Sequence, residues 1–141
     1  MLAVLTLIAS ITLVVSYHRF QTHIPNGDHV PNPCLVPPTW NPVGHYDPVH
    51  HTNTKNPFGL DFRQNNFTWT EALCRKDSDK DGKTNGEELG DSSCTWQPGN
   101  PAPALAIGHP GICEPLGSAM CAYQHFACDC LETCQGLVGH I

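Results

Sequence analysis

Eight cysteines constrain this chain more than any other feature of its sequence. Their number is even, so disulfides are the expected cross-links if the protein folds in an oxidising compartment. Eight cysteines allow roughly a hundred pairings, and the spacing does not choose among them. A zinc cluster drawn from the last three cysteines is an alternative, which a secreted chain disfavours. The cysteines are Cys34, Cys74, Cys94, Cys113, Cys121, Cys128, Cys130 and Cys134.

The first 16 residues predict a secretory signal peptide. The segment MLAVLTLIASITLVVS contains 12 apolar residues and no charge, and the small side chains of Val14 and Ser16 offer a cleavage site before Tyr17. The alternative is an uncleaved anchor, but the run is shorter than the ~20 apolar residues of a spanning helix. No later segment could cross a bilayer. We therefore expect a secreted, extracellular protein with no membrane partner.

The 125 residues after the predicted signal peptide can bury only a thin core. They include 44 apolar residues and 25 prolines and glycines. Such a composition does not favour long regular elements, so cross-links must supply part of the stability. Because large apolar groups are few, we expect Trp40, Trp69 and Trp96 in the core or against disulfides.

The pattern of turn formers predicts a small, largely irregular α+β fold with short strands around one or two helices. Residues 17–67 are dense in Pro, Gly and Asn, which indicates turns and short extended segments, not helices. A capping box formed by Thr68 and Glu71 predicts that a short helix begins there. It would lead directly into the acidic segment that follows.

The C-terminal part has a different composition. Residues 116–141 are rich in Cys, Ala, Met and Leu, and we predict a helix that Ser118 caps and Gly136 ends. The expected organisation is a signal peptide at 1–16, a domain stabilised by disulfides and calcium at 17–115, and this cysteine-rich tail.

Residues 77–88, DSDKDGKTNGEE, match the calcium loop of an EF-hand. Calcium takes six to eight oxygen ligands, and Gly82 permits the tight bend that such a loop needs. Four carboxylates held together without a cation would repel one another, although an acidic, solvated turn is the alternative. Spacing alone does not separate calcium from magnesium. The predicted ligands are the carboxylates of Asp77, Asp79 and Asp81, the carbonyl of Lys83, Asn85 directly or through water, and bidentate Glu88.

The loop does not have the features of a calcium sensor. After Glu88 the sequence allows about one helical turn before Gly90, whereas a full EF-hand has a longer second helix. Thr84 stands where paired loops carry an apolar β-branched residue, and no second loop occurs. We therefore predict a structural calcium site. Cys74 and Cys94 bracket it, and would either close the loop by pairing together or connect it to other parts of the domain.

Other functional classes find less support. A transition-metal site drawn from the histidines lacks a suitable spacing, so surface or packed histidines are the better interpretation. There is no GxSxG, no HExxH and no free thiolate, so we do not predict an enzyme. The net charge of −6 and the absence of a basic stripe argue against nucleic acid. Asn66 begins a single glycosylation sequon. The histidines considered are His29, His45, His50, His51 and His109.

Several segments together resemble the temptin family of secreted, water-borne molluscan pheromone proteins. They are IPNG at 24–27, VPNPC at 30–34, NPFGLDF at 56–62, DSDKDGKTNGEELGD at 77–91, CTW at 94–96 and HPGIC at 109–113. The tail after Cys113 extends beyond this shared block. The gap from Cys34 to Cys74 also departs from the EGF-like spacing to which temptins are compared.

The resemblance implies a non-enzymatic extracellular signal that promotes attraction and mating. It implies protein contacts with other secreted pheromone polypeptides of the attractin kind, and we expect a monomer when the protein is free. The alternative function is a calcium-binding structural protein of extracellular matrix, shell or egg mass. A metalloenzyme built on the histidines is the third hypothesis.

Overall fold

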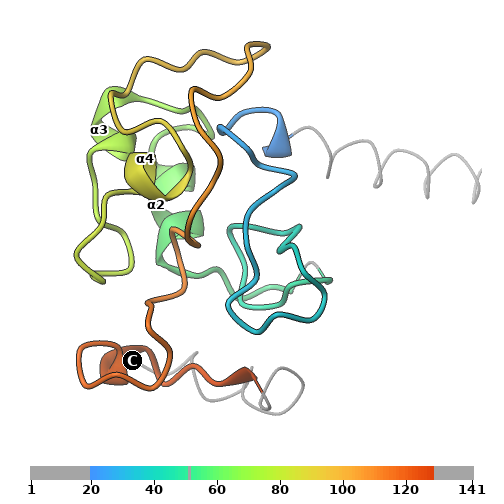
Figure 1. Cartoon of the computed structure of the whole chain (residues 1–141), viewed down its shortest axis with the longest axis vertical. Coiled ribbons are helices and arrows are strands. Elements are labelled where there is room, and N and C mark those ends of the chain that lie inside the picture. The colour runs from blue at the N-terminus through green and yellow to red at the C-terminus, as the bar shows by residue number, and fades with distance from the viewer. Residues whose placement is uncertain (1–19, 51, 129–141) are drawn as a thin grey trace, which may run out of the picture.

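The computed structural model describes residues 20–50 and 52–128 (Figure 1). Residues 20–21 are helical, and the helices bounded within the described residues are α2 (Pro57–Gln64), α3 (Glu71–Cys74), α4 (Asn85–Glu88) and the 3-10 helix η1 (Ala122–Gln124). The protein is thus a small disulfide-rich domain with few helices and little strand structure. The predicted signal peptide, His51, Cys130, Cys134 and Gly136 lie outside the described residues.

The strands expected of an α+β fold are reduced, in this part of the chain, to two isolated antiparallel bridges. They pair Pro31 with Thr39 and His45 with Lys55. The physical reason is the density of proline between residues 31 and 48, since proline has no N–H to donate to a ladder. Residues 22–50 and 52–56 therefore consist mainly of turns and bends that hydrogen-bond locally.

The prediction that residues 17–67 contain no helix is wrong at α2. Asn56 caps this helix by accepting a hydrogen bond from the Gly59 N–H at 2.9 Å, and Pro57 occupies the first turn, where its missing N–H costs nothing. Phe58 and Phe62, one turn apart, stack at 5.9 Å between ring centroids. These local signals outweigh the turn formers nearby.

The short helix before the acidic segment is confirmed as α3, but its cap is Thr70, not Thr68. The Thr70 hydroxyl accepts a hydrogen bond from the Leu73 N–H at 3.1 Å. The Thr68 hydroxyl instead donates to the carbonyl of Asn66 at 3.3 Å. Both threonines offer the same chemistry, so the sequence pattern placed the start of the helix two residues too early.

The tail helix predicted from Ser118 is wrong over the described residues 118–128. Of the helices with defined bounds only η1 lies there, because the Cys113–Cys121 disulfide and the Gln124 side chain hold this segment in a compact turn. The Gln124 amide accepts from the Cys113 N–H at 2.9 Å and donates to the Gly111 carbonyl at 2.8 Å. Residues 129–141 lie outside the described part.

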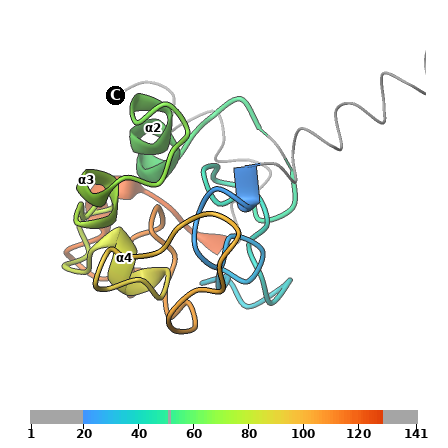
Figure 2. The ribbon, with the colours of Figure 1, turned by 90° about the horizontal axis from the view of Figure 1, so that it is seen from above.

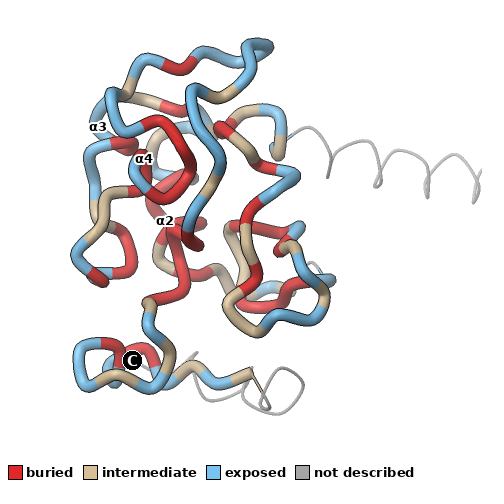
Figure 3. The backbone as a smooth tube through the Cα atoms, viewed as in Figure 1, coloured by how far each residue is buried: buried red, intermediate tan, exposed pale blue. Residues whose placement is uncertain are grey.

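Within the described residues, three disulfides and two apolar clusters hold the domain together. Figure 3 shows in red that buried residues occur in many separate segments of the described chain. The disulfides join Cys34 to Cys128, Cys74 to Cys94 and Cys113 to Cys121. The larger cluster contains two of the three tryptophans, and the smaller one is built around the third, so their expected core positions are confirmed. The tryptophans are Trp69 and Trp96 in the larger cluster and Trp40 in the smaller. Within the described residues, no helix has the length and apolar character to cross a membrane.

Candidate metal site

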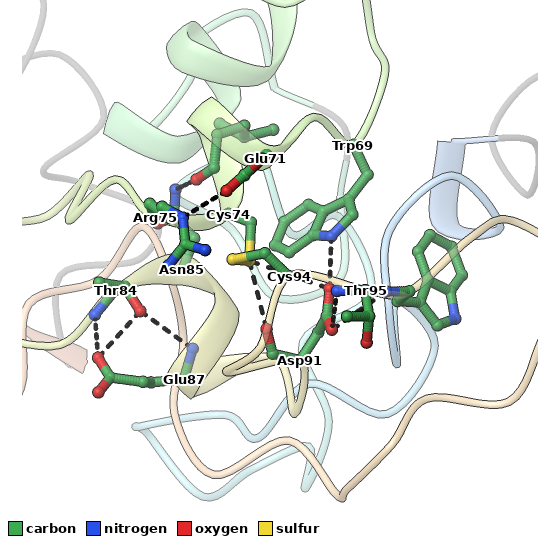
Figure 4. The surroundings of a disulfide bond; sticks show 12 residues. Trp69, Glu71, Cys74, Arg75, Thr84, Asn85, Glu87, Asp91, Cys94 and Thr95 are labelled. Carbon is green, nitrogen blue, oxygen red and sulfur yellow. Dashed lines mark hydrogen bonds and ion pairs between the residues drawn. A yellow bond between two sulfur atoms is a disulfide. The ribbon is translucent and has the colours of Figure 1, made fainter.

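The loop of residues 77–88 follows α3 and ends with α4, and a disulfide joins the chain before it to the chain after it (Figure 4). It leaves α3 after Cys74 and enters α4 at Asn85, and the Asn85 N–H donates to the Lys76 carbonyl at 2.7 Å. The Asn85 amide also donates to the Leu73 carbonyl at 2.7 Å. Of the two arrangements expected for the bracketing cysteines, the structure has the direct pair, Cys74 with Cys94.

The helix α4, at the end of the loop, is a single turn, and the sequence predicts a helix of about this length. Thr84 and Glu87 form a complete capping box at its start (Figure 4). Leu89 ends it, and Gly90 follows with φ of +80°, a conformation that favours glycine. The long exit helix of a paired EF-hand is therefore absent from this position.

Three predicted ligands come together in the loop. One carboxylate oxygen from each of Asp77, Asp79 and Asp81 lies within 4.8 Å of the others. Asp79 is completely buried and Asp81 nearly so. The carboxylate of Glu88 is not part of this three-residue cluster, although Glu88 is also fully buried.

Several buried acceptor oxygens of the loop make no hydrogen bond to any described residue. An unsatisfied buried polar group costs about 1–3 kcal/mol, and more if it is charged, so native proteins rarely leave several of them together. All of them are hard oxygen acceptors, the donor set that calcium and magnesium prefer over transition metals. The residues present therefore fit a hard cation. The atoms are Asp77 Oδ1, Asp79 Oδ2, Asn85 Oδ1 and both Glu88 carboxylate oxygens.

Burial and mutual repulsion change the titration of two loop carboxylates. Burial, followed by the charge of Asp81, raises the pKa of Asp79 to about 7. Burial and then the charge of Asp79 raise the pKa of Glu88 to about 10. Both carboxylates favour the proton, because burial removes their hydration and the attraction of Lys83 lowers the pKa of Glu88 only in part.

Lys83 supplies part of the missing positive charge. Its Nζ lies 3.4 Å from Asp81 Oδ2, and its backbone N–H donates to Asp81 Oδ1 at 2.8 Å. The pKa of Lys83 is raised: burial would lower it, but the combined attraction of Asp81, Glu88 and Glu114 outweighs that effect. The ion pair of Lys83 is with Asp81, and the buried oxygens of Glu88 accept no hydrogen bond from it.

Two residues beyond the loop also face it, and the sequence pattern did not reveal them. Burial raises the pKa of Glu114, and the negative charge of Glu114 in turn contributes to the raised pKa of Glu88. The Tyr123 hydroxyl donates to the backbone carbonyl of Asp79, and Lys80 lies over the Tyr123 ring at 5.9 Å. Only the fold brings residues 114–123 to the loop, so no local signal could have identified them.

The described histidines do not converge on a metal site. His29 contacts Asp28 at 2.8 Å, and His50 contacts Asp47 at 3.1 Å. His109 is buried against Trp40, with 4.8 Å between ring centroids. Within residues 20–50 and 52–128, the three aspartates form the one cluster of His, Cys, Asp or Glu side chains with metal-binding geometry.

Two further candidate sites from the sequence are the glycosylation sequon, at the surface, and the zinc cluster, in the tail. Asn66, the first residue of the glycosylation sequon, is exposed and has φ of +54°. Cys128, which the zinc alternative required, is joined to Cys34 instead.

Comparison with known proteins identifies the family. Residues 14–112 match the family described as Temptin C-terminal. The chain is 45% identical over 103 residues to "Temptin" of Aplysia californica, an alignment that covers 72% of this chain and 82% of that protein. No solved structure matches the chain. The sequence resemblance is thereby confirmed, and the protein belongs to the temptin family.

Proposed function

We propose that the loop of residues 77–88 binds one calcium ion and that the ion stabilises the fold. The observation that carries the proposal is the group of buried, unpartnered acceptor oxygens in this loop. A divalent cation would compensate the carboxylates of Asp77, Asp79, Asp81 and Glu88 together. Bound calcium would then replace the protons that the raised pKa values of Asp79 and Glu88 favour, and would keep the carboxylates ionised.

The proposed role is structural, because the surroundings of the loop leave little room for a sensor-like opening. The Cys74–Cys94 disulfide closes the loop, and α4 is only four residues long. Extracellular calcium modules bind the ion at about 0.1–1 mM and stay loaded in their medium. Saturation of this kind would keep the domain in one conformation.

We further propose that the protein is a secreted pheromone component that acts by contact with other secreted polypeptides of the attractin kind. Membership of the temptin family is the support for this biological role. Calcium and disulfides would serve it by holding the contact surface in its binding conformation, which lowers the ordering cost of association.

The segment of residues 104–108 is the surface that we assign to this contact. Leu105 is 81% exposed and Ile107 is 67% exposed, and apolar anchors of this kind contribute to protein interfaces. The Ile107 N–H donates to the carbonyl of Glu88 at 2.8 Å, and the Ala104 N–H donates to that of Gly90 at 3.0 Å. The metal loop and this exposed segment are thus connected through the backbone.

The test is a calorimetric titration of the oxidised protein with a purified attractin-like polypeptide, with calcium and with EDTA. We expect binding that weakens in EDTA and is lost in the double variant Leu105→Ser, Ile107→Ser. The matched control is Leu35→Ser, Val36→Ser, since these side chains are 77% and 79% exposed in another segment. No binding to the wild-type protein, or equal loss in both double variants, would contradict the proposal.

A further inference from the structure

A cavity of about 410 Å³ lies away from the metal loop, beside α2. Residues 41–45 and 52–55 contribute to one of its walls, and Figures 1 and 2 place them and the loop of residues 77–84 on opposite sides of the molecule. Small-molecule sites have volumes of roughly 300–1,000 Å³ and mostly apolar walls. The apolar wall here consists of Phe20, Ile24, Val43, Phe58, Phe62 and Phe67.

Aromatic rings that contact one another build this wall. Phe20 and Phe67 are 4.9 Å apart between ring centroids, and Phe62 meets Phe67 edge-on at 5.7 Å. Phe67 has φ of +55°, a region that bulky residues rarely adopt. Its N–H donates to the Phe62 carbonyl at 2.9 Å, which holds this unusual backbone in place. The fold therefore accepts local strain where the Phe67 ring forms the wall.

Hydrogen bonds hold the opposite side of the cavity. The Asn56 amide donates to the carbonyl of Val43 at 2.7 Å and to that of His45 at 3.0 Å. The Gln21 amide donates to the Asn41 carbonyl at 2.9 Å, which connects the start of the described chain to the same segment. The cavity is therefore largely pre-formed, and a ligand would not have to order its walls.

The charge of the lining is one-sided. Lys55 is among the lining residues, and no aspartate or glutamate lines the cavity. Among the described residues, the ion pairs of lysine and arginine side chains involve Lys76, Lys83 and Arg75 but not Lys55. A lysine over an apolar cavity in an acidic protein provides a local attraction for a negative group. Apolar walls with one cation are complementary to a molecule that has an apolar body and one acidic end.

We propose that this cavity binds a small organic carboxylate with an apolar body, of the class of medium-chain fatty acids. The apolar chain lies among the phenylalanine rings, and the carboxylate pairs with the ammonium of Lys55. This inference goes beyond the proposed protein contact and requires neither calcium nor a polypeptide partner.

The experiment titrates the full oxidised chain with octanoate and, separately, with 1-octanol, by calorimetry. We expect saturable one-to-one binding of octanoate and weaker binding of the alcohol. Lys55→Met removes the ammonium and keeps an apolar stem, so octanoate affinity falls about tenfold while octanol affinity is unchanged. The matched control is Arg75→Met, which removes an exposed cation from the residue after α3 and leaves both affinities unchanged.

A second variant tests the location without removing a charge. Asn53 is exposed and lines the cavity, so Asn53→Trp fills its mouth and weakens both ligands. The melting temperature of each variant reports whether it is folded. The proposal is overturned if octanoate does not saturate the protein, if it binds no better than octanol, or if Asn53→Trp leaves its affinity unchanged. An unchanged octanoate affinity in folded Lys55→Met also overturns it.

Discussion

The indole nitrogen of Trp69 lies 2.9 Å from Oδ2 of Asp91, and both side chains are buried beside the Cys74–Cys94 disulfide (Figure 4). Oδ1 of Asp91 also accepts hydrogen bonds from the backbone N–H groups of Thr95, at 2.9 Å, and Trp96, at 3.1 Å. One carboxylate thus joins the segment before α3 to the segment after α4. A buried carboxylate is tolerated because its oxygens are satisfied in this way.

Trp69→Phe removes one of these donors from a buried charge. We expect the free energy of unfolding to fall by about 2 kcal/mol, within the range for a lost hydrogen bond to a charged group. The control is Trp96→Phe, whose indole donates at 2.8 Å to the neutral carbonyl of the exposed residue Asn100, and it should cost about half as much. Urea unfolding of both variants measures the difference. Equal losses would show that the Asp91 carboxylate does not depend on the indole.

His109 should make stability depend on pH. Complete burial lowers its pKa to about 3, below the ordinary value of 6.5. The unfolded chain therefore binds a proton below pH 6.5 that the folded state does not, and stability falls between pH 6.5 and 3, by up to about 1.4 kcal/mol per pH unit. His109→Asn keeps an acceptor for the Gly111 N–H, which lies 3.1 Å from Nδ1, and does not titrate.

The difference in unfolding free energy between wild type and His109→Asn, measured by urea unfolding from pH 7 to 4, isolates this contribution. It should change steadily as the pH falls below 6.5. The control is Leu60→Ala, at a partly exposed position without a titratable group, whose difference from the wild type should not depend on pH. A pH-independent difference for His109→Asn would contradict the assignment.

Gly59→Ala adds only one methyl group, but it should destabilise the protein strongly. A Cβ at Gly59 would overlap the carbonyl oxygen of Gly44, because α2 packs there directly on the backbone. The helix has to move, and we expect a loss of about 2–3 kcal/mol in urea unfolding. Leu60→Ala, at the neighbouring and 43% exposed position, should cost about 0.5 kcal/mol. Similar values for the two variants would rule out this close backbone contact.

Tyr123→Phe tests whether the tail supports the metal loop. The change removes the hydroxyl that donates to the Asp79 carbonyl but keeps the ring beneath Lys80. If the loop binds calcium, its affinity should fall about threefold to tenfold, since one hydrogen bond that holds the loop is lost. Thr52→Val is the control, because it removes a hydroxyl that donates to a backbone carbonyl, that of Thr54, in a separate segment. An unaltered affinity in Tyr123→Phe would separate the tail from the loop.

Sequence patterns predicted the features that residues close together in the chain determine. Asp77 to Asp81 meet as the spacing indicates, and α4 ends after one turn because Gly90 follows it. The position of Thr70 as a cap could not be chosen over Thr68, since both are threonines before a helical segment. The helix α2 is not evident from the local sequence, because prolines and glycines that are typical of turns surround the cap at Asn56.

Contacts between distant segments could not be predicted. The disulfide from Cys34 to Cys128 spans 94 residues, and the pairing of eight cysteines is not encoded in their spacing. For the same reason Glu114 and Tyr123 were not recognised as neighbours of the metal loop. The cavity beside Lys55 also combines residues from three separate segments, so its charge and shape are properties of the fold.

The most direct test of the structural calcium site is a calorimetric titration of the oxidised protein with calcium, combined with thermal unfolding in calcium and in EDTA. We predict one site with a dissociation constant of about 0.1–1 mM and a melting temperature at least about 5 °C higher in excess calcium. Asp79→Asn should weaken both effects. Glu87→Gln should preserve both, because Glu87 is exposed and glutamine also completes a capping box. A wild-type protein that shows neither heat of binding nor a shift in melting temperature would contradict the account.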